Sequence, residues 1–192
     1  MPSRDVKLAP GESYHVYNRG NNRGRIFFEP ENYRFFLRRA REYLLPIMDV
    51  VAYCFMPTHY HFLTQVKMGR EGTMVSNAMM RLSVSYTKAM NTRYDRVGSL
   101  FQGRFQSKRV TSNDYLLHLS RYIHLNPVLA GLVERAQQWE FSSYLDYIGE
   151  RRGTLPKPQI VLSQLGSPKA YRAFVEGYVP EKREVIADLL FE

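Results

Sequence analysis

Two histidines separated by a single residue, His59 and His61, are the side chains of this sequence best suited to binding a metal. They directly follow Met56-Pro57-Thr58, a turn-like stretch. If residues 59–66 form a β-strand, both imidazoles project from one face of the sheet, because alternate residues of a strand face the same way. Two neutral imidazoles held side by side form half of a site for a divalent metal. A purely structural pair is the alternative at this point.

A second segment, residues 122–127, offers a nucleophile and a further ligand on an expected helix. Tyr122 and Asn126 are four residues apart, so the hydroxyl and the amide share one helix face. A tyrosine hydroxyl has a pKa of about 10 and is a weak nucleophile at neutral pH. A metal that polarises a phosphodiester would compensate by stabilising charge on its oxygens.

These groups would support strand transfer rather than hydrolysis. Attack by Tyr122 leaves a covalent phosphotyrosine and a free 3′-hydroxyl, so the phosphodiester energy is retained and no ATP is needed. A lone tyrosine at a helix edge can also be structural. A phosphodiesterase that activates water would need more carboxylate ligands than this neighbourhood offers.

The elements that must position these residues can be read from periodicity. Strands are expected over 13–17, 47–55, 59–66 and 101–110, and helices over 30–44, 70–93 and 112–125. In the last helix Leu116, Leu119 and Ile123 form the buried stripe, Tyr122 lies at its edge, and Pro127 opposes continuation. This order predicts an α+β fold, an RRM- or ferredoxin-like antiparallel sheet with helices packed on one face.

The composition changes near residue 150, where Arg151-Arg152-Gly153 and Pro156-Lys157-Pro158 resemble a linker. Short helical patterns follow over 170–176 and 182–190. We therefore expect a catalytic domain over residues 1–150 and a small helical C-terminal extension over 151–192.

The bulk composition is that of a globular protein with a basic surface. The 192 residues include 27 Lys and Arg against 18 Asp and Glu, a net charge of +9, which favours a polyanionic partner such as nucleic acid. A basic surface without such a partner is the alternative. Cys54 is the only cysteine, so neither an intrachain disulfide nor a cysteine-based zinc site is possible. With a polar N-terminus and no run of ~20 apolar residues, the chain is expected in the cytoplasm, away from the membrane.

Several basic residues are candidates for contacts with a nucleic-acid backbone. Residues 18–25 combine arginine with glycine, which lets a backbone approach a phosphate closely, although a plain solvated turn would look the same. By charge and position, the candidates are Arg19, Arg23, Arg25, Arg104, Lys108 and Arg109. His118 and His124 could form hydrogen bonds or contact DNA, and His15 receives no role.

The motifs together resemble a known family. His59-Tyr60-His61 is similar to the histidine–hydrophobic–histidine motif of HUH single-strand nucleases, and residues 122–128 resemble the nucleophile helix of the IS200-like, single-tyrosine (Y1) transposases. Residues 55–61 and the opening over 14–20 match best the REP-associated tyrosine transposase branch. The resemblance covers residues 11–150.

That resemblance implies roles for individual residues. Tyr122 would be the nucleophile, His59 and His61 would bind Mg²⁺ or Mn²⁺, and Asn126 would be the third ligand, where many relatives have glutamine. It implies an RRM-like fold and a DNA-binding enzyme of DNA transposition and recombination, which cleaves and rejoins single-stranded DNA near hairpins through a 5′-phosphotyrosine. The protein would act as a monomer or a homodimer in the bacterial cytoplasm, associated with the nucleoid when DNA-bound.

The alternative from another class is a non-catalytic, RRM-like nucleic-acid-binding module, a degenerate or domesticated transposase. A binding module has no need of the trio His59, His61 and Tyr122, which argues against it. The aromatic consensus of an RRM is also missing.

Overall fold

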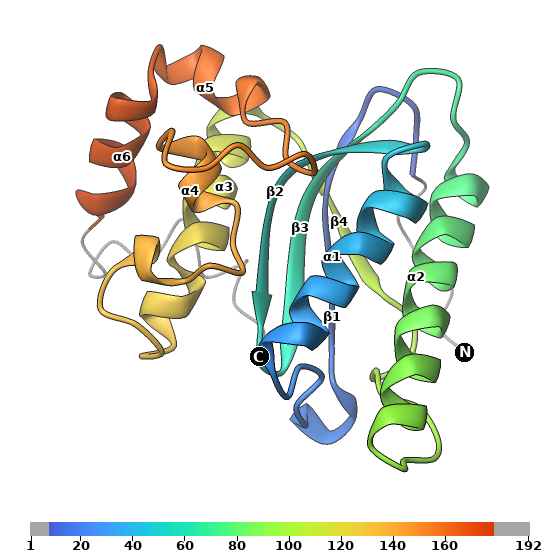
Figure 1. The fold of residues 1–192 in the computed structure, drawn as a ribbon. Helices are drawn as coiled ribbons and strands as arrows, with labels where there is room; N and C mark the ends of the chain where they lie inside the picture. Colours follow the sequence, from blue (N-terminus) through green and yellow to red (C-terminus); the bar gives the residue numbers. More distant parts are fainter. Residues whose placement is uncertain (1–7, 179–192) are drawn as a thin grey trace.

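A computed structural model describes residues 8–178, and in this part of the chain four strands form one antiparallel sheet (Figure 1). The strands are β1 (Ser13–Arg19), β2 (Met48–Met56), β3 (His59–Val66) and β4 (Gln106–Val110), in the order β2-β3-β1-β4. With α1 (Pro30–Leu44) and α2 (Gly72–Arg93), the chain order is β1-α1-β2-β3-α2-β4. This is the ferredoxin-like arrangement. The predicted α+β fold is confirmed.

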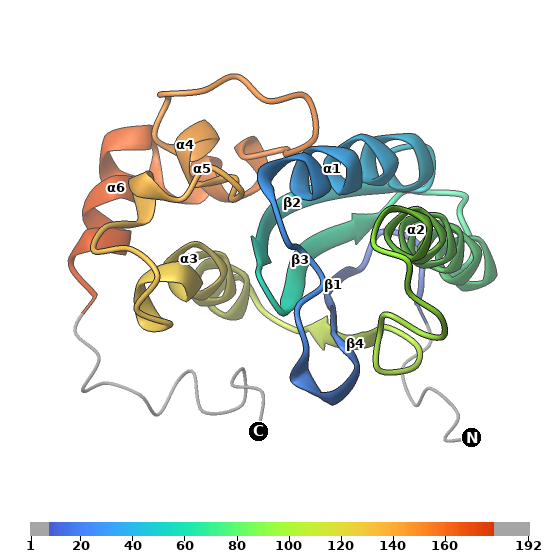
Figure 2. The same cartoon turned by 60° about the horizontal axis from the view of Figure 1, so that its bottom comes forward.

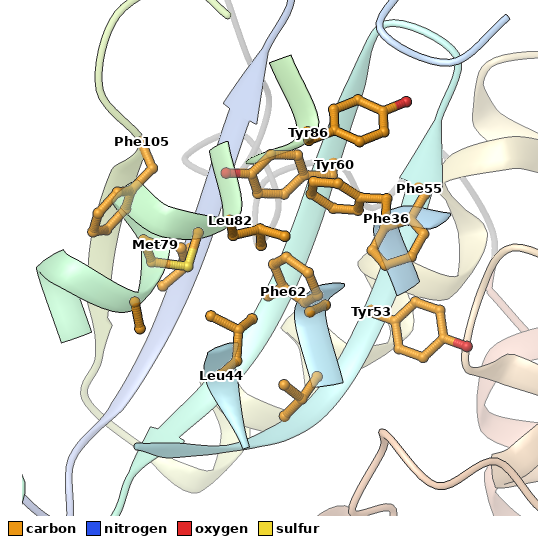
Figure 3. Packing of buried hydrophobic residues seen from close by; sticks show 14 of the residues in the cluster. Phe36, Leu44, Tyr53, Phe55, Tyr60, Phe62, Met79, Leu82, Tyr86 and Phe105 are labelled. Atoms are coloured by element: carbon orange, nitrogen blue, oxygen red, sulfur yellow. The ribbon is translucent and has the colours of Figure 1, made fainter. Parts of the chain in front are cut away.

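The first two helices cover one face of the sheet. Side chains of β2 and β3, among them Phe55, Tyr60 and Phe62, interlock there with Phe36 of α1 and Tyr86 of α2 (Figure 3). The strands expected over 47–55 and 59–66 supply three of these side chains, and a register shift between Val50 and Ala52 changes which residues of β2 face the helices. Aromatic pairs fill the layer, with centroids 4.9 Å apart for Phe36 and Tyr86.

A third long helix, α3 (Asn113–Leu129), packs on the opposite face, where a second hydrophobic cluster joins it to β2 and β3 (Figure 2). The prediction that helices pack on one face therefore holds for α1 and α2, whereas α3 packs on the opposite face of the sheet. The reason is that β2 is apolar on both sides: Tyr53 and Phe55 face α1 and α2, whereas Cys54 and Met56 belong to the second cluster.

Two predicted boundaries differ from the structure. α3 runs through Pro127 to Leu129, because a proline near the end of a helix costs only the bond to the Ile123 carbonyl. The strand expected over 101–110 begins only at Gln106, since Gly103 adopts a left-handed φ of 73° that interrupts extended backbone.

The short elements η1 (Asn21–Arg23), η2 (Ala136–Gln138), α4 (Tyr144–Tyr147), α5 (Gln159–Leu165) and α6 (Pro168–Glu176) complete the described chain.

The described residues beyond 150 pack against the sheet and α3. The expected linker is held against β2, where the Lys157 N–H donates to the Val50 carbonyl at 2.8 Å. Val161 of α5 and Tyr171 of α6 are buried in the second hydrophobic cluster, together with residues of α3. The domain boundary at 150 stays a prediction, and the helical pattern over 182–190 lies outside the described residues.

No helix within residues 8–178 is both long enough and apolar enough to cross a membrane.

Candidate active site

Two elements from distant parts of the chain build the site. β3 presents His59 and His61 toward α3, on the side of the sheet that carries Leu63. Ser112 caps the N-terminus of α3, because its hydroxyl accepts a hydrogen bond from the Tyr115 N–H at 3.1 Å. The buried residues Leu119 and Ile123 hold this helix on the sheet and set its rotation.

The structure brings together the four residues proposed for catalysis and metal binding. The ring of Tyr122 meets His61 edge-on, with centroids 5.8 Å apart at 79°. Oδ1 of Asn126 lies 3.3 Å from Nε2 of His59, and Asn126 also forms a hydrogen bond with Tyr122. The two histidine rings are 5.0 Å apart. A hydroxyl, an amide oxygen and two imidazoles therefore converge between β3 and α3.

Burial controls the charge of these groups. It lowers the pKa of His59, against the opposing effect of the hydrogen bond with Asn126, and it lowers the pKa of His61 well below 6.5. Both rings are thus neutral at neutral pH, the state that binds metals. Burial also raises the pKa of the Tyr122 hydroxyl, so a nearby positive charge would have to favour its deprotonation.

The orientation of the histidines fits a cation. Nδ1 of His59 lies 2.9 Å from Oγ1 of Thr58, and Nδ1 of His61 lies 2.9 Å from Nε2 of His15. Nε2 is then the ring nitrogen that would bind a metal in each case. Nδ2 of Asn126 is buried without a hydrogen-bond partner among the described residues. Within residues 8–178 no three His, Cys, Asp or Glu side chains form a metal site, so the amide of Asn126 would have to be the third protein ligand.

Sequence reasoning left His15 without a role, and the structure places it at the centre of this face. His15 is 2% exposed and stacks on His61 with ring centroids 5.1 Å apart. A signal was present in the sequence: His15 and Tyr17 alternate on an expected strand just as His59 and His61 do. The pairing of that strand with β3, however, could not be predicted from the alternation of its residues.

Two of the proposed DNA-contacting cations flank the histidines. Arg19 is paired with His59 across β1 and β3, and Lys108 is paired with His15 across β1 and β4, so both project from the same face. Their positive charges act on the histidines: after burial, Arg19 contributes to the lowered pKa of His59, and Lys108 contributes to the lowered pKa of His15.

The other proposed cations lie around this face or away from it. Arg23 and Arg25 are exposed in the loop after β1, whose Gly20 N–H donates to the Thr58 carbonyl beside His59. Arg104 lines a cavity of about 950 Å³ between α2 and residues 99–106. Arg109 is paired with Tyr14 across β1 and β4, and its guanidinium binds Glu12 at 2.7 Å.

The remaining histidines have structural surroundings. Nδ1 of His124 lies 2.7 Å from the Tyr171 hydroxyl and its Nε2 lies 2.8 Å from Oγ of Ser143, all in the buried cluster. Nδ1 of His118 lies 2.8 Å from the guanidinium of Arg121. His118 and His124 were each expected to form hydrogen bonds or to contact DNA, and the structure shows a hydrogen-bond partner for both.

Comparison with known proteins agrees with the motifs. No family model matches the chain. A Haemophilus influenzae protein named as a REP-associated tyrosine transposase is 26% identical over 105 residues, an alignment that covers 50% of this chain and 58% of that protein. This chain thus spans little more than half the length of that curated relative.

One solved structure shows the same fold. A REP-associated tyrosine transposase bound to a REP hairpin superposes with a TM-score of 0.64 at 16% identity, covering 82% of this chain and 98% of that one. A transposase structure from Deinococcus radiodurans, also 16% identical, covers 64% of this chain and 95% of its own, with a TM-score of 0.41. The comparisons agree with the resemblance seen in the motifs: this chain is similar in sequence to a protein named as a REP-associated tyrosine transposase, and it shares its fold with a solved structure of that name.

Proposed function

We propose that this protein is a metal-dependent transposase that cleaves and rejoins single-stranded DNA by transesterification through Tyr122, at hairpins of the REP type. One observation carries the proposal: Tyr122 and Asn126 of α3 lie against His61 and His59 of β3, although the two segments are separated by some sixty residues. The relationship to REP-associated tyrosine transposases supports the choice of DNA as substrate, as does the net charge of +9.

In the proposed reaction the Tyr122 oxygen attacks the scissile phosphorus. The new bond forms while the bond from phosphorus to the 3′ oxygen breaks, Tyr122 loses its proton, and the departing 3′ oxygen gains one. The product is a 5′-phosphotyrosine with a free 3′-hydroxyl, and the same steps in reverse join another 3′ end. The edge-on packing against His61 and the hydrogen bond with Asn126 hold the tyrosine ring for this attack.

The divalent metal, Mg²⁺ or Mn²⁺, would be held by Nε2 of His59, Nε2 of His61 and Oδ1 of Asn126. When bound, it would stabilise negative charge on the phosphoryl and leaving oxygens. Arg19 and Lys108 would hold phosphates on either side, because they project from the same face of the sheet.

A denaturing gel with labelled single-stranded hairpin DNA tests the proposal directly. With Mn²⁺ the wild-type protein is expected to give a protease-sensitive, slowly migrating adduct, which EDTA and the substitution Tyr122→Phe both abolish while DNA binding persists. Retained cleavage by Tyr122→Phe would remove this residue from the mechanism. Tight binding without an adduct, across a broad panel of hairpins, would favour a non-catalytic binding module.

A further inference from the structure

The contact between His15 and His61 is set by the register of the sheet. In the antiparallel pairing of β1 and β3, Tyr17 is opposite His61 and His15 is opposite Leu63. His15 is therefore the diagonal neighbour of His61 on the same face. The two rings stack at an interplanar angle of 19°, and Nε2 of His15 lies 2.9 Å from Nδ1 of His61.

This distance restricts the proton positions on both rings. A neutral imidazole carries one N–H and one lone pair. If Nε2 of His61 offers its lone pair to a cation, the proton of His61 must sit on Nδ1, which faces His15. That N–H can only donate to an unprotonated Nε2 of His15, so His15 must carry its own proton on Nδ1.

The geometry around His15 suits it as the acceptor. It is 2% exposed, its ring stacks on His61, and its Nε2 faces Nδ1 of His61 at 2.9 Å. A neutral ring at this position can accept the hydrogen bond, whereas a cationic ring could not. Thr58 contacts Nδ1 of His59 at 2.9 Å in the same manner, so each histidine of the pair has a neighbour at its Nδ1.

We propose that His15 is a positioning residue for His61: it accepts the hydrogen bond from Nδ1, fixes the tautomer and the ring orientation, and so directs Nε2 of His61 toward the cation. The role in metal binding rests on the proposed function, whereas the tautomer of His61 can be tested without it. Loss of a hydrogen-bonding partner behind a metal-binding histidine typically weakens metal affinity about 10–100-fold.

Three variants separate hydrogen bonding from packing. His15→Phe fills the space without an acceptor, and His15→Gln retains an acceptor of similar reach. Val16→Ala is the matched control, because it removes buried volume from the neighbouring residue of β1, on the face toward α1 and α2. Mn²⁺ binding to the full chain is measured by electron paramagnetic resonance, and the histidine tautomers are read from long-range ¹H–¹⁵N NMR spectra of the metal-free protein.

We expect His61 of the wild-type chain to carry its proton on Nδ1, and His15→Phe to shift that proton toward Nε2 and weaken Mn²⁺ binding about 10–100-fold. His15→Gln should restore much of the affinity, and Val16→Ala should leave it unchanged. A wild-type His61 protonated on Nε2 would overturn the proposal even if His15→Phe fails to fold. Unchanged Mn²⁺ affinity in a folded His15→Phe would overturn the role of His15 alone, whereas absence of Mn²⁺ binding by the wild-type chain would overturn the metal site as well.

Discussion

Histidines of this protein have two kinds of surroundings, which their hydrogen-bond partners distinguish. Both ring nitrogens of His124 face hydroxyl groups of the core, from Tyr171 and Ser143. His59 instead directs Nε2 at the amide oxygen of Asn126, next to the candidate nucleophile. Residue type alone therefore does not distinguish these histidines, whereas the group opposite each ring nitrogen does.

Replacing His59 by alanine tests its proposed role as a ligand. We expect His59→Ala to weaken Mn²⁺ binding and to reduce adduct formation. Both losses should exceed the roughly 10–100-fold that is typical when a metal-binding histidine loses its hydrogen-bonding partner. His118→Ala is the matched control, since His118 lies against Arg121 and Phe174, outside the site. Titration with Mn²⁺ and the denaturing gel measure both quantities; wild-type values for His59→Ala would exclude a metal role.

The amide of Asn126 can be tested with two substitutions of nearly equal size. Asn126→Asp keeps an oxygen where Oδ1 lies 3.3 Å from His59 and adds negative charge, so it should bind Mn²⁺ at least as tightly as the wild-type chain. Asn126→Leu removes the oxygen and should weaken Mn²⁺ binding. Equal affinities for the two variants would show that the side chain of residue 126 is not a ligand.

At the scale of elements, the C-terminal helices anchor the helix that carries Tyr122. The Tyr171 hydroxyl of α6 donates to Oγ of Ser120 at 3.1 Å and lies 2.7 Å from Nδ1 of His124, so it contacts α3 on both sides of Tyr122. A buried polar network thus ties the extension to the helix that carries Tyr122.

Removing this hydroxyl should lower stability. Tyr171→Phe leaves His124 without one of its buried partners, and we expect the free energy of unfolding to fall by about 1–3 kcal/mol. Tyr43→Phe, at a half-buried tyrosine of α1, is the control. Urea unfolding monitored by circular dichroism gives both values. A loss no larger than that of the control would mean that the network does not stabilise the docking of α6.

At the scale of the whole molecule, two neighbouring cations of β4 differ in the face of the sheet from which they project. Lys108 and Arg109 are neighbours on β4, yet Lys108 is paired with His15 and Arg109 with Tyr14. Their side chains therefore project from opposite faces, and Arg109 is already bound to Glu12.

This difference predicts unequal effects on DNA binding. Lys108→Ala should reduce the slope of log affinity against log salt concentration for a single-stranded hairpin by about 0.7–1, the contribution of one phosphate contact. Arg109→Ala should change the slope less, because Arg109 projects from the face of the sheet opposite to that of His15 and Lys108. Fluorescence anisotropy between low and moderate salt measures both slopes. A larger effect for Arg109→Ala would place the DNA on the other face.

The sequence by itself determined the local elements and the residues each one presents. β-branched and aromatic runs joined by a short link predicted the strands over 47–55 and 59–66, helical spacing predicted α1 and the buried stripe of α3, and the order of elements predicted the ferredoxin-like sheet. The spacings of His59 with His61 and of Tyr122 with Asn126 are likewise local, because a strand repeats every two residues and a helix every 3.6. The predicted boundaries were wrong at Pro127 and at the start of β4, because in each place a single proline or glycine decides whether the helix or strand continues.

Only the tertiary structure decided which of these residues meet. His15 lies 46 residues from His61 in sequence, and their contact depends on the pairing of β1 with β3. The opposite facing of Lys108 and Arg109 depends on register in the same way, since a shift of one residue would exchange their faces. The packing of α3 against β3, rather than beside α1 and α2, was set by apolar surface on both sides of the sheet. Periodicity carries no information on such pairings, because they depend on burial summed over segments far apart in the chain.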